Sequence, residues 1–193
     1  EQATEALLAA VENALQVQDG YERFAALLEQ CRENADKSEA GNAQEQFVAQ
    51  MEQAVQQMGN ATTEEAVDEA VASLKNAAVA FLTSAEAWPK EGESWDVTLL
   101  MDNPSFDPEE KGWNDMPTQR SGVAEFYNRN FNMYQALTGL KNGKYTIQVK
   151  ALYRTGENDG GEAYKNGTET IPATLFANEK TQPVVSLYAF PYE

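Results

Sequence analysis

The residues best suited to chemistry are aromatic and planar polar side chains spread over residues 125–154. Sugar rings present flat C–H faces and many hydroxyl groups, so their binding sites combine exposed aromatic rings with Arg, Asn, Gln or Glu. This segment supplies that mixture in Glu125, Tyr127, Tyr134, Gln148 and Arg154. These five residues form a candidate glycan-binding face. The alternative is that the face packs against another layer of protein, with Arg154 paired to an acid, because strand tyrosines often simply cover a sheet.

Trp113 and an acidic loop are two further candidates. Trp113 offers another platform for a sugar ring, or it fills a core as buried tryptophans commonly do. The loop after the first expected strand carries Asp102, Asp107, Glu109 and Glu110. Calcium requires six to eight oxygen ligands, which such a loop and its backbone carbonyls can supply. The loop therefore holds a structural calcium ion or is a solvated acidic loop, since it has no EF-hand spacing. No other cofactor is expected.

The composition offers little for catalysis. The chain has no histidine and one cysteine, Cys31, which excludes an imidazole-based triad and a Cys/His zinc cluster. Cys31 lies within a helical pattern, where a lone cysteine is more often a small buried hydrophobe than a nucleophile. Paired carboxylates can hydrolyse glycosides, but among 31 acidic residues no pair is singled out. We therefore expect a protein that is not an enzyme.

Charge restricts the partners of this chain. The formal net charge is −17, and residues 1–90 and 91–193 are both acidic. Both parts repel a phosphate backbone, so we expect no nucleic-acid ligand. No stretch approaches the roughly 18 apolar residues of a membrane-spanning helix, so we expect no direct membrane insertion. The chain starts at Glu1 in mid-pattern, and we expect part of an extracellular or cell-surface protein whose signal or anchor lies outside this segment.

Helical periodicity is confined to residues 1–88. Four segments carry apolar residues at 3.6-residue spacing, and these stripes are expected to form the core of a small antiparallel bundle. The first segment ends near Gly20. The other three start at Asp19, Asn42 and Thr62, each followed three residues later by a glutamate, as in a helix N-cap with its N3 acid. Aromatic residues are sparse here and abundant beyond, which marks a domain boundary.

The stretch from Phe47 to Ala85 combines an Asn60-Ala61-Thr62 turn, the acidic start Glu64-Glu65 and a following Ala/Val/Leu run. On these features it resembles the small helical spacer modules of bacterial surface proteins known as FIVAR-type repeats. The resemblance implies a spacer or stalk without chemistry of its own.

Beyond Trp88 the pattern changes to short alternating runs separated by turn residues. Several short strands without an intervening helix predict an antiparallel sandwich or barrel. A two-residue turn at Arg129-Asn130 would place Phe126 opposite Met133 and gather the pairs Tyr127/Asn132 and Glu125/Tyr134 around the other face. The six expected strands are Val97–Met101, Val123–Asn128, Phe131–Leu137, Tyr145–Arg154, Ala173–Ala177 and Val184–Ala189.

Four features of this part follow the order of a known module: Asn103-Pro104-Ser105-Phe106, Gly112-Trp113, the run from Tyr134 to Leu140, and Gly143-Lys144-Tyr145-Thr146. In that order they resemble a galactose-binding-like jelly roll, the β-sandwich of many carbohydrate-binding modules on bacterial glycan-degrading enzymes. The resemblance implies a glycan ligand and a structural calcium near the first loop. The β part also resembles surface proteins of gut commensal bacteria. Such modules need more strands than this part supplies, so we expect the sandwich to be incomplete at its C-terminal end.

These features predict a helical bundle over residues 1–88, a linker over 89–95 and a jelly-roll β-sandwich over 96–193. The expected function is a non-catalytic, secreted or cell-surface binding module for a glycan, displayed on a helical spacer. The alternative is a structural or adhesion protein whose β part mediates domain–domain or protein–protein contacts. The two differ in whether the face around Tyr127, Tyr134 and Arg154 is open.

Overall fold

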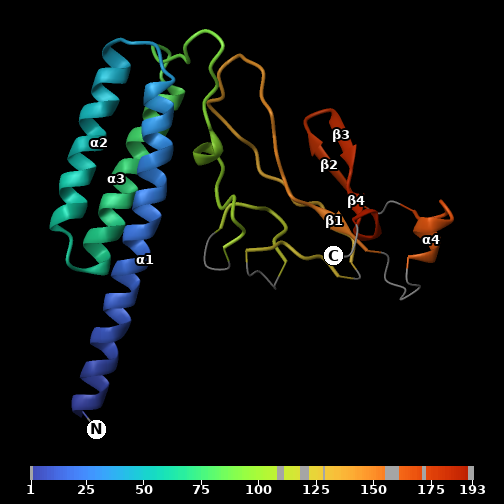
Figure 1. The fold of residues 1–193 in the computed structure, drawn as a ribbon, viewed down its shortest axis with the longest axis horizontal. Coiled ribbons are helices and arrows are strands. Elements are labelled where there is room, and N and C mark those ends of the chain that lie inside the picture. Colours follow the sequence, from blue (N-terminus) through green and yellow to red (C-terminus); the bar gives the residue numbers. More distant parts are fainter. Residues whose placement is uncertain are drawn as a thin grey trace. The chain divides into compact units, whose positions relative to one another are not determined.

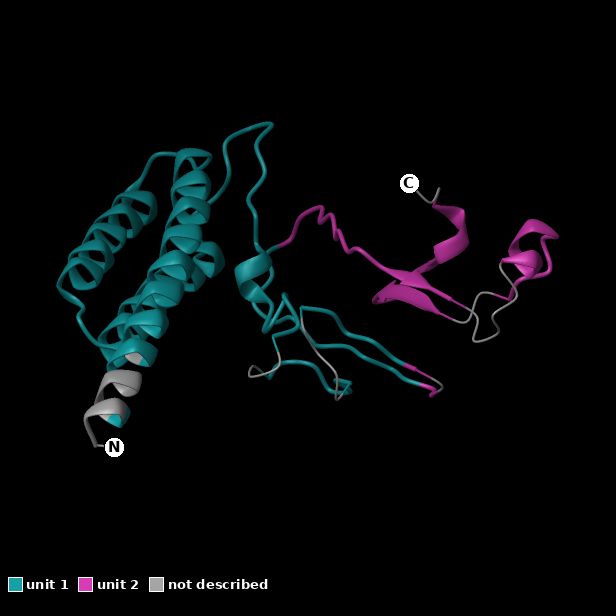
Figure 2. Ribbon diagram, turned by 60° about the horizontal axis from the view of Figure 1, so that its bottom comes forward, with its two compact units in different colours: residues 1–126, 131–141 teal, residues 127–130, 142–193 magenta. Residues whose placement is uncertain are grey.

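A computed structural model of the chain describes residues 2–107, 111–117, 122–127, 129–154, 161–170 and 173–190. The chain divides into two compact units (Figure 2). The first unit comprises residues 1–126 and 131–141, and the second comprises residues 127–130 and 142–193. We describe each unit by itself. The predicted division into residues 1–88, 89–95 and 96–193 stays a prediction.

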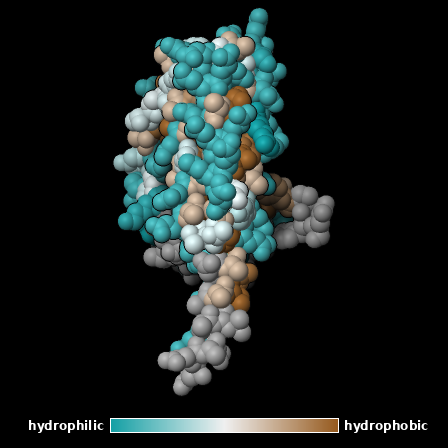
Figure 3. Space-filling view, turned by 90° about the vertical axis from the view of Figure 1, so that its left-hand side faces the viewer, coloured by the Kyte–Doolittle hydropathy of each residue, from teal (hydrophilic) through white to brown (hydrophobic). Residues whose placement is uncertain are grey.

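Three helices form the bundle of the first unit: α1 (Gln2–Asp36), α2 (Asn42–Asn60) and α3 (Glu64–Thr83) (Figure 1). The connections between them are short, so neighbouring helices run antiparallel. Their apolar stripes meet in one core, in which Leu74 and Val67 are fully buried and Phe47 stacks on Phe81 with ring centroids 4.4 Å apart. The predicted helices that became α2 and α3 are confirmed. The face of the bundle shown in Figure 3 is mainly hydrophilic, as expected for amphipathic helices.

The predicted helix break near Gly20 is wrong, because α1 continues through this residue. A Cβ atom at Gly20 would lie 2.2 Å from Cγ1 of Val67 on α3. The missing side chain therefore allows two helices to approach closely and does not end one of them. Asp19 lies inside α1, where its carboxylate forms an ion pair with Arg23 at 3.3 Å.

The other two predicted helix starts are shifted by one residue. Gly41 is the N-cap of α2, so Asn42 is the first residue of the helix. Thr63, and not Thr62, caps α3, and its hydroxyl oxygen accepts a hydrogen bond from the Ala66 N–H at 3.3 Å. Either threonine could supply the same hydroxyl, so the type of cap followed from the sequence and its position did not.

The chain that follows α3 is hydrogen-bonded to the residues directly after α1. The Glu39 N–H donates to the Trp88 carbonyl at 2.9 Å, and the Lys90 N–H donates to the Lys37 carbonyl at 2.8 Å. Trp95 then packs against Phe81, and its indole N–H donates to the Ser38 hydroxyl at 3.0 Å. This segment therefore belongs to the packed part of the first unit.

The predicted strand Val97–Met101 is wrong, since residues Thr98–Leu100 form a 3-10 turn, η1. The carboxylate of Asp96 accepts a hydrogen bond from the Thr98 N–H at 2.8 Å, a local contact that favours a turn over an extended strand. Val97, Leu99 and Leu100 pack against the helical core. Their apolar character therefore reflects burial against helices, and not one face of a sheet.

The predicted jelly-roll β-sandwich is also wrong for the residues that the structure describes. They contain two sheets of two strands each. The parallel sheet pairs β1 (Leu152–Tyr153) with β4 (Val185–Ser186), and the antiparallel hairpin pairs β2 (Thr174–Ala177) with β3 (Lys180–Pro183). The described residues of the expected strands 123–128 and 131–137 form none. Phe126 stacks on Phe131 there, with ring centroids 3.9 Å apart, and does not face Met133 as predicted.

The second unit holds all four strands, with the short helix α4 (Glu162–Lys165) and the 3-10 turn η2 (Leu187–Ala189) (Figure 2). Of the expected strand Tyr145–Arg154, only β1 is part of a sheet. The expected strands at 173–177 and 184–189 are each present in part, as β2 and β4. The hairpin turn contains Asn178 at φ 51°, a backbone conformation that asparagine tolerates better than most residues.

Candidate interaction surface

Asn103 organises the loop that was the predicted calcium site. Its side chain is buried, donates to the Asp107 carbonyl at 2.9 Å and accepts from the Asp107 N–H at 2.6 Å. The Asn103 backbone has φ 45°, and its carbonyl accepts the indole N–H of Trp113 at 2.9 Å. Opposite, a Cβ atom at Gly112 would lie 2.5 Å from Cβ of Asp102. Asn103, Gly112 and Trp113 therefore have structural roles within one tight loop.

Side-chain amides also hold the segment that faces this loop. The Gln135 amide accepts from the Asp102 N–H and donates to the Asp102 carbonyl, both at 2.9 Å. The Asn114 amide donates to the Asn132 carbonyl at 2.9 Å and accepts from the Tyr134 N–H at 2.6 Å. Each carboxamide thus offers one donor and one acceptor to backbone groups, as a neighbouring strand would. These bonds replace the ladder that the sequence led us to expect.

This arrangement bears on Trp113 and on the calcium prediction. Trp113 is partly buried and packs against Phe106 at 5.5 Å between ring centroids. Its role as a platform for a sugar ring stays a prediction. Asp102 and Asp107 are described, whereas Glu109 and Glu110 lie outside the described residues. Across the described part of the chain, no group of three or more His, Cys, Asp or Glu side chains could hold a metal ion. The calcium site stays a prediction.

The five residues of the candidate glycan-binding face are all exposed, but they divide between the units. Glu125 and Tyr134 belong to the first unit, whereas Tyr127, Gln148 and Arg154 belong to the second. Neither unit assembles the set by itself. The jelly-roll frame that would have brought them together is absent from the described residues, so the fold gives a glycan ligand no support. Their role in binding stays a prediction.

Residues 144–150 of the second unit form an exposed stretch, which we call the open segment. All seven residues are exposed, and none belongs to a helix or strand (the orange trace before β1 in Figure 1). Apolar Tyr145, Ile147 and Val149 alternate with polar residues, and Ile147 and Val149 are 65% and 48% exposed. No hydrogen bond is formed by residues 146–150 with any described residue. The open segment thus has the alternation of a strand, and its residues 146–150 form no ladder with a described strand.

A row of exposed apolar side chains beside unpaired backbone groups is characteristic of a strand edge open to pairing. Folded proteins protect such edges or use them to bind an extended polypeptide. The alternation in this segment predicted a strand, Tyr145–Arg154, of a β-sandwich. The signal that could have distinguished the two outcomes is the number of partner strands, which alternation alone does not reveal.

A hollow of about 420 Å³ lies elsewhere in the second unit, beside β1 and β4. Its lining includes Tyr153, Tyr164, Glu169 and Ser186, which the sequence did not single out. The Ser186 hydroxyl donates to the Glu169 carboxylate at 3.2 Å. Burial raises the pKa of Tyr153, and its hydrogen bond to Glu169 and the charge of that carboxylate raise it further. With no histidine in the chain, this serine has no imidazole base, and the cluster holds β4 against residues 161–170.

Half-buried Lys141 makes a further contact between the bundle of the first unit and the chain that follows it. The Lys141 ammonium donates to the Ala87 carbonyl and lies 4.6 Å from the Trp88 ring centroid and 4.9 Å from that of Trp95. Burial lowers the pKa of Lys141. The two indole faces stabilise the charge that burial disfavours, so this lysine attaches residues 131–141 to the bundle.

Comparison with known proteins gave no match: no family model, no curated protein and no solved structure is similar to this chain. The three resemblances named above are therefore not supported by a detectable relative. Among the described helices, none combines the length and apolar character that crossing a bilayer requires.

Proposed function

We propose that this chain is a non-catalytic structural or adhesion protein that binds another polypeptide through the open segment, residues 144–150. The observation that carries the proposal is the exposed alternation of Tyr145, Ile147 and Val149 on a backbone that forms no described ladder. Pairing with an added strand would bury the apolar row and satisfy the backbone groups together. The bundle formed by α1, α2 and α3 provides a stable attached body.

A polypeptide suits the open segment better than a glycan does. A glycan site needs aromatic and planar polar groups gathered around a sugar ring, and the residues predicted for that role are split between the two units. The open segment presents aliphatic Ile147 and Val149, which provide apolar contact without the flat platform of an aromatic ring. An extended backbone needs neither a pocket nor a platform, because main-chain hydrogen bonds supply affinity.

The proposal is tested by presenting the full-length chain to two ligand collections. One is a display library of extended peptides with randomised charge, and the other is a glycan array. We expect peptides to be enriched on the wild-type chain and lost on Ile147→Asp, which places a charge in the middle of the apolar row. Tyr164→Ala, an exposed aromatic residue away from the open segment, is the control and should leave the enrichment unchanged.

Two results would contradict the proposal. Glycans that bind the wild type while no peptide is enriched would restore the carbohydrate hypothesis. Peptides that bind wild type and Ile147→Asp equally would place the contact elsewhere in the molecule.

A further inference from the structure

We infer that the strand which pairs with the open segment is acidic, with Glu or Asp alternating with apolar residues. The inference rests on the proposed function and specifies its partner. Residues 142–154 contain three basic residues and no acidic residue, whereas the rest of the chain has 11 basic and 31 acidic residues. The open segment and its flank are therefore a basic stretch in a strongly acidic protein.

The basic residues share one row of this stretch. Side chains alternate between the two faces of a strand, so pairing with an added strand would place Lys144, Lys150 and Arg154 on the face opposite Tyr145, Ile147 and Val149. All three are exposed, and none forms an ion pair with a described residue. A pairing strand would meet apolar side chains on one face and unpaired cations on the other.

Cross-strand pairing rules then specify the partner. Opposite charges on directly opposed residues stabilise a strand pair, whereas like charges destabilise it. The best partner strand therefore has apolar side chains opposite Tyr145, Ile147 and Val149. Its other face carries carboxylates opposite Lys144 and Lys150. A sequence in which acidic and apolar residues alternate places the two kinds of side chain on opposite faces of the partner strand.

The same rules argue against a second copy of this chain as the partner. To pair the whole apolar row with itself in antiparallel register, Ile147 must face Ile147, and Tyr145 must face Val149. That register places Lys144 opposite Lys150 at both ends of the pair.

The experiment uses three synthetic peptides and the full-length chain, with binding followed by fluorescence anisotropy. The first peptide is Glu-Val-Glu-Ile-Glu-Val-Glu, blocked at both ends, and the second has Lys in place of every Glu. The third is the acidic peptide with methyl groups on alternate backbone nitrogens, which removes the donors that a ladder needs. We expect the acidic peptide to bind roughly tenfold or more tightly than the basic one, from opposed charges at two cross-strand positions.

Three variants make the result specific. Ile147→Asp should abolish binding of the acidic peptide, and the double variant Lys144→Glu with Lys150→Glu should reverse the preference in favour of the basic peptide. Lys165→Glu is a matched control, because it reverses an exposed lysine on α4 outside the open segment. It should leave the preference for the acidic peptide in place. Methylation of the backbone should weaken binding by the same order as Ile147→Asp.

Each other outcome has a defined meaning. Equal binding of acidic and basic peptides, lost with Ile147→Asp, would overturn the acidic partner and leave the proposed function intact. Acidic binding that survives both Ile147→Asp and methylation would show attraction by charge alone and overturn the inference. A wild-type dimer in sedimentation that Ile147→Asp dissociates would assign the open segment to a second copy instead. Failure of every peptide, including those from the display library, would overturn the proposed function as well.

Discussion

The bundle and the segment that follows it belong to one compact unit, yet different interactions hold them in place. The helices satisfy their own backbone groups and bury a continuous apolar core around Leu74, Val67 and Phe47. The described residues of 95–126 and 131–135 form no ladder, and many of their backbone groups bond to carboxamide side chains. Four amides do this, each with one donor and one acceptor contact: Asn34 to Asp96, Asn103 to Asp107, Asn114 to Asn132 and Tyr134, and Gln135 to Asp102.

The difference concerns how much each region depends on particular residues. Apolar packing requires volume and is shared among many side chains, so one altered residue weakens the core without removing it. A carboxamide that bridges a backbone N–H and C=O requires both a donor and an acceptor in fixed positions, which only Asn and Gln side chains supply. The bundle should therefore lose stability globally when it is altered, and the later segment should open locally.

Among the truncations to alanine, the largest effect is expected from Leu74→Ala in α3. Leu74 is fully buried, and its truncation leaves a cavity in the only large core of the first unit's described residues. The free energy of unfolding should fall by about 2–5 kcal/mol, measured by urea denaturation followed by circular dichroism at the helical signal. Leu15→Ala on α1 is the matched control, since Leu15 is exposed and should change stability by less than about 0.5 kcal/mol. Equal losses for both variants would show that α1, α2 and α3 do not share the described core.

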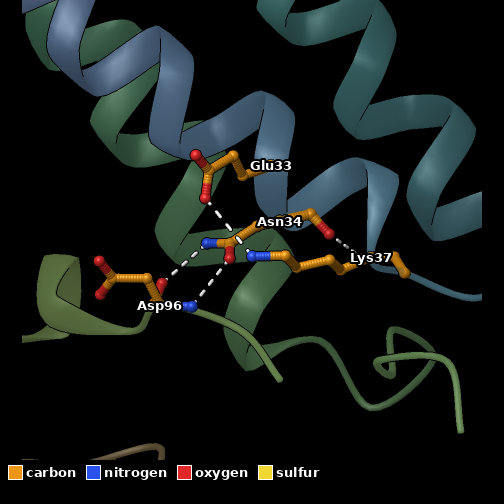
Figure 4. Close-up of polar contacts among 5 residues, drawn as sticks. Glu33, Asn34, Lys37 and Asp96 are labelled. Carbon is orange, nitrogen blue, oxygen red and sulfur yellow. Dashed lines mark hydrogen bonds and ion pairs between the residues drawn. The ribbon is translucent and has the colours of Figure 1, made fainter. Parts of the chain in front are cut away.

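A smaller and more local effect is expected from Asn34→Ala. Asn34 is 2% exposed, and its amide donates to the Asp96 carbonyl at 2.7 Å and accepts from the Asp96 N–H at 2.9 Å (Figure 4). Truncation leaves both groups of Asp96 without these partners, a loss of about 1–3 kcal/mol. Hydrogen exchange should become faster in a peptide that covers residues 95–100 and remain slow in α2.

The control for Asn34→Ala is Gln46→Ala, which removes an exposed amide that bonds Asn42 within α2 at 3.1 Å. Exchange in residues 95–100 should not respond to it. If Asn34→Ala instead accelerated exchange throughout the bundle, the amide would be part of the global core, and the contrast between the two regions would be wrong.

Sequence reasoning succeeded where local pattern decides the structure. Periodicity located α2 and α3 because an amphipathic helix satisfies its own backbone and needs only one apolar face buried. It failed at Gly20, where a tertiary contact with Val67 explains the glycine better than a helix end does. A single sequence shows that a glycine is present but does not show which residue of another helix packs against it.

The β prediction failed for a related physical reason. Alternation at Tyr145, Ile147 and Val149 indicates that a segment could form a strand, but a strand exists only when another strand accepts its hydrogen bonds. The amide contacts of Asn114 and Gln135 were beyond prediction too, since their backbone partners lie between 18 and 33 residues away in sequence. Their residue types suit loops generally, and nothing local indicates which backbone groups they reach.

The stability of the bundle should depend on pH through the buried thiol of Cys31. Burial raises the pKa of this thiol from 9.0 to about 12. The folded state therefore holds the proton more tightly than the unfolded state, so this stability is complete below pH 9 and is lost as pH rises from 9 to 12. The free energy of unfolding should fall by about 1 kcal/mol per pH unit in that window.

Comparison with Cys31→Ala isolates this contribution. The pKa shifts of Lys141 and Tyr153 occur in both proteins and cancel in the difference between them. Denaturation at pH 8 and pH 10 should show a larger loss for the wild type than for Cys31→Ala. Identical losses would mean that Cys31 is accessible to water in the folded bundle, contrary to its complete burial.

The smallest effect on stability is expected from Ile147→Asp, and its small size is informative. Ile147 is 65% exposed and contributes nothing to the helical core, so a charge there should change the melting temperature little, within about 0.5 kcal/mol in free energy. Val67→Asp introduces the same charge at a fully buried position and should unfold the bundle, because a buried unpaired carboxylate is strongly unfavourable. If Ile147→Asp were instead strongly destabilising, the chain itself would already cover residue 147. The open segment would then be a structural strand and not a surface for a partner. A small effect on stability together with lost peptide binding is the combination that only a binding surface produces.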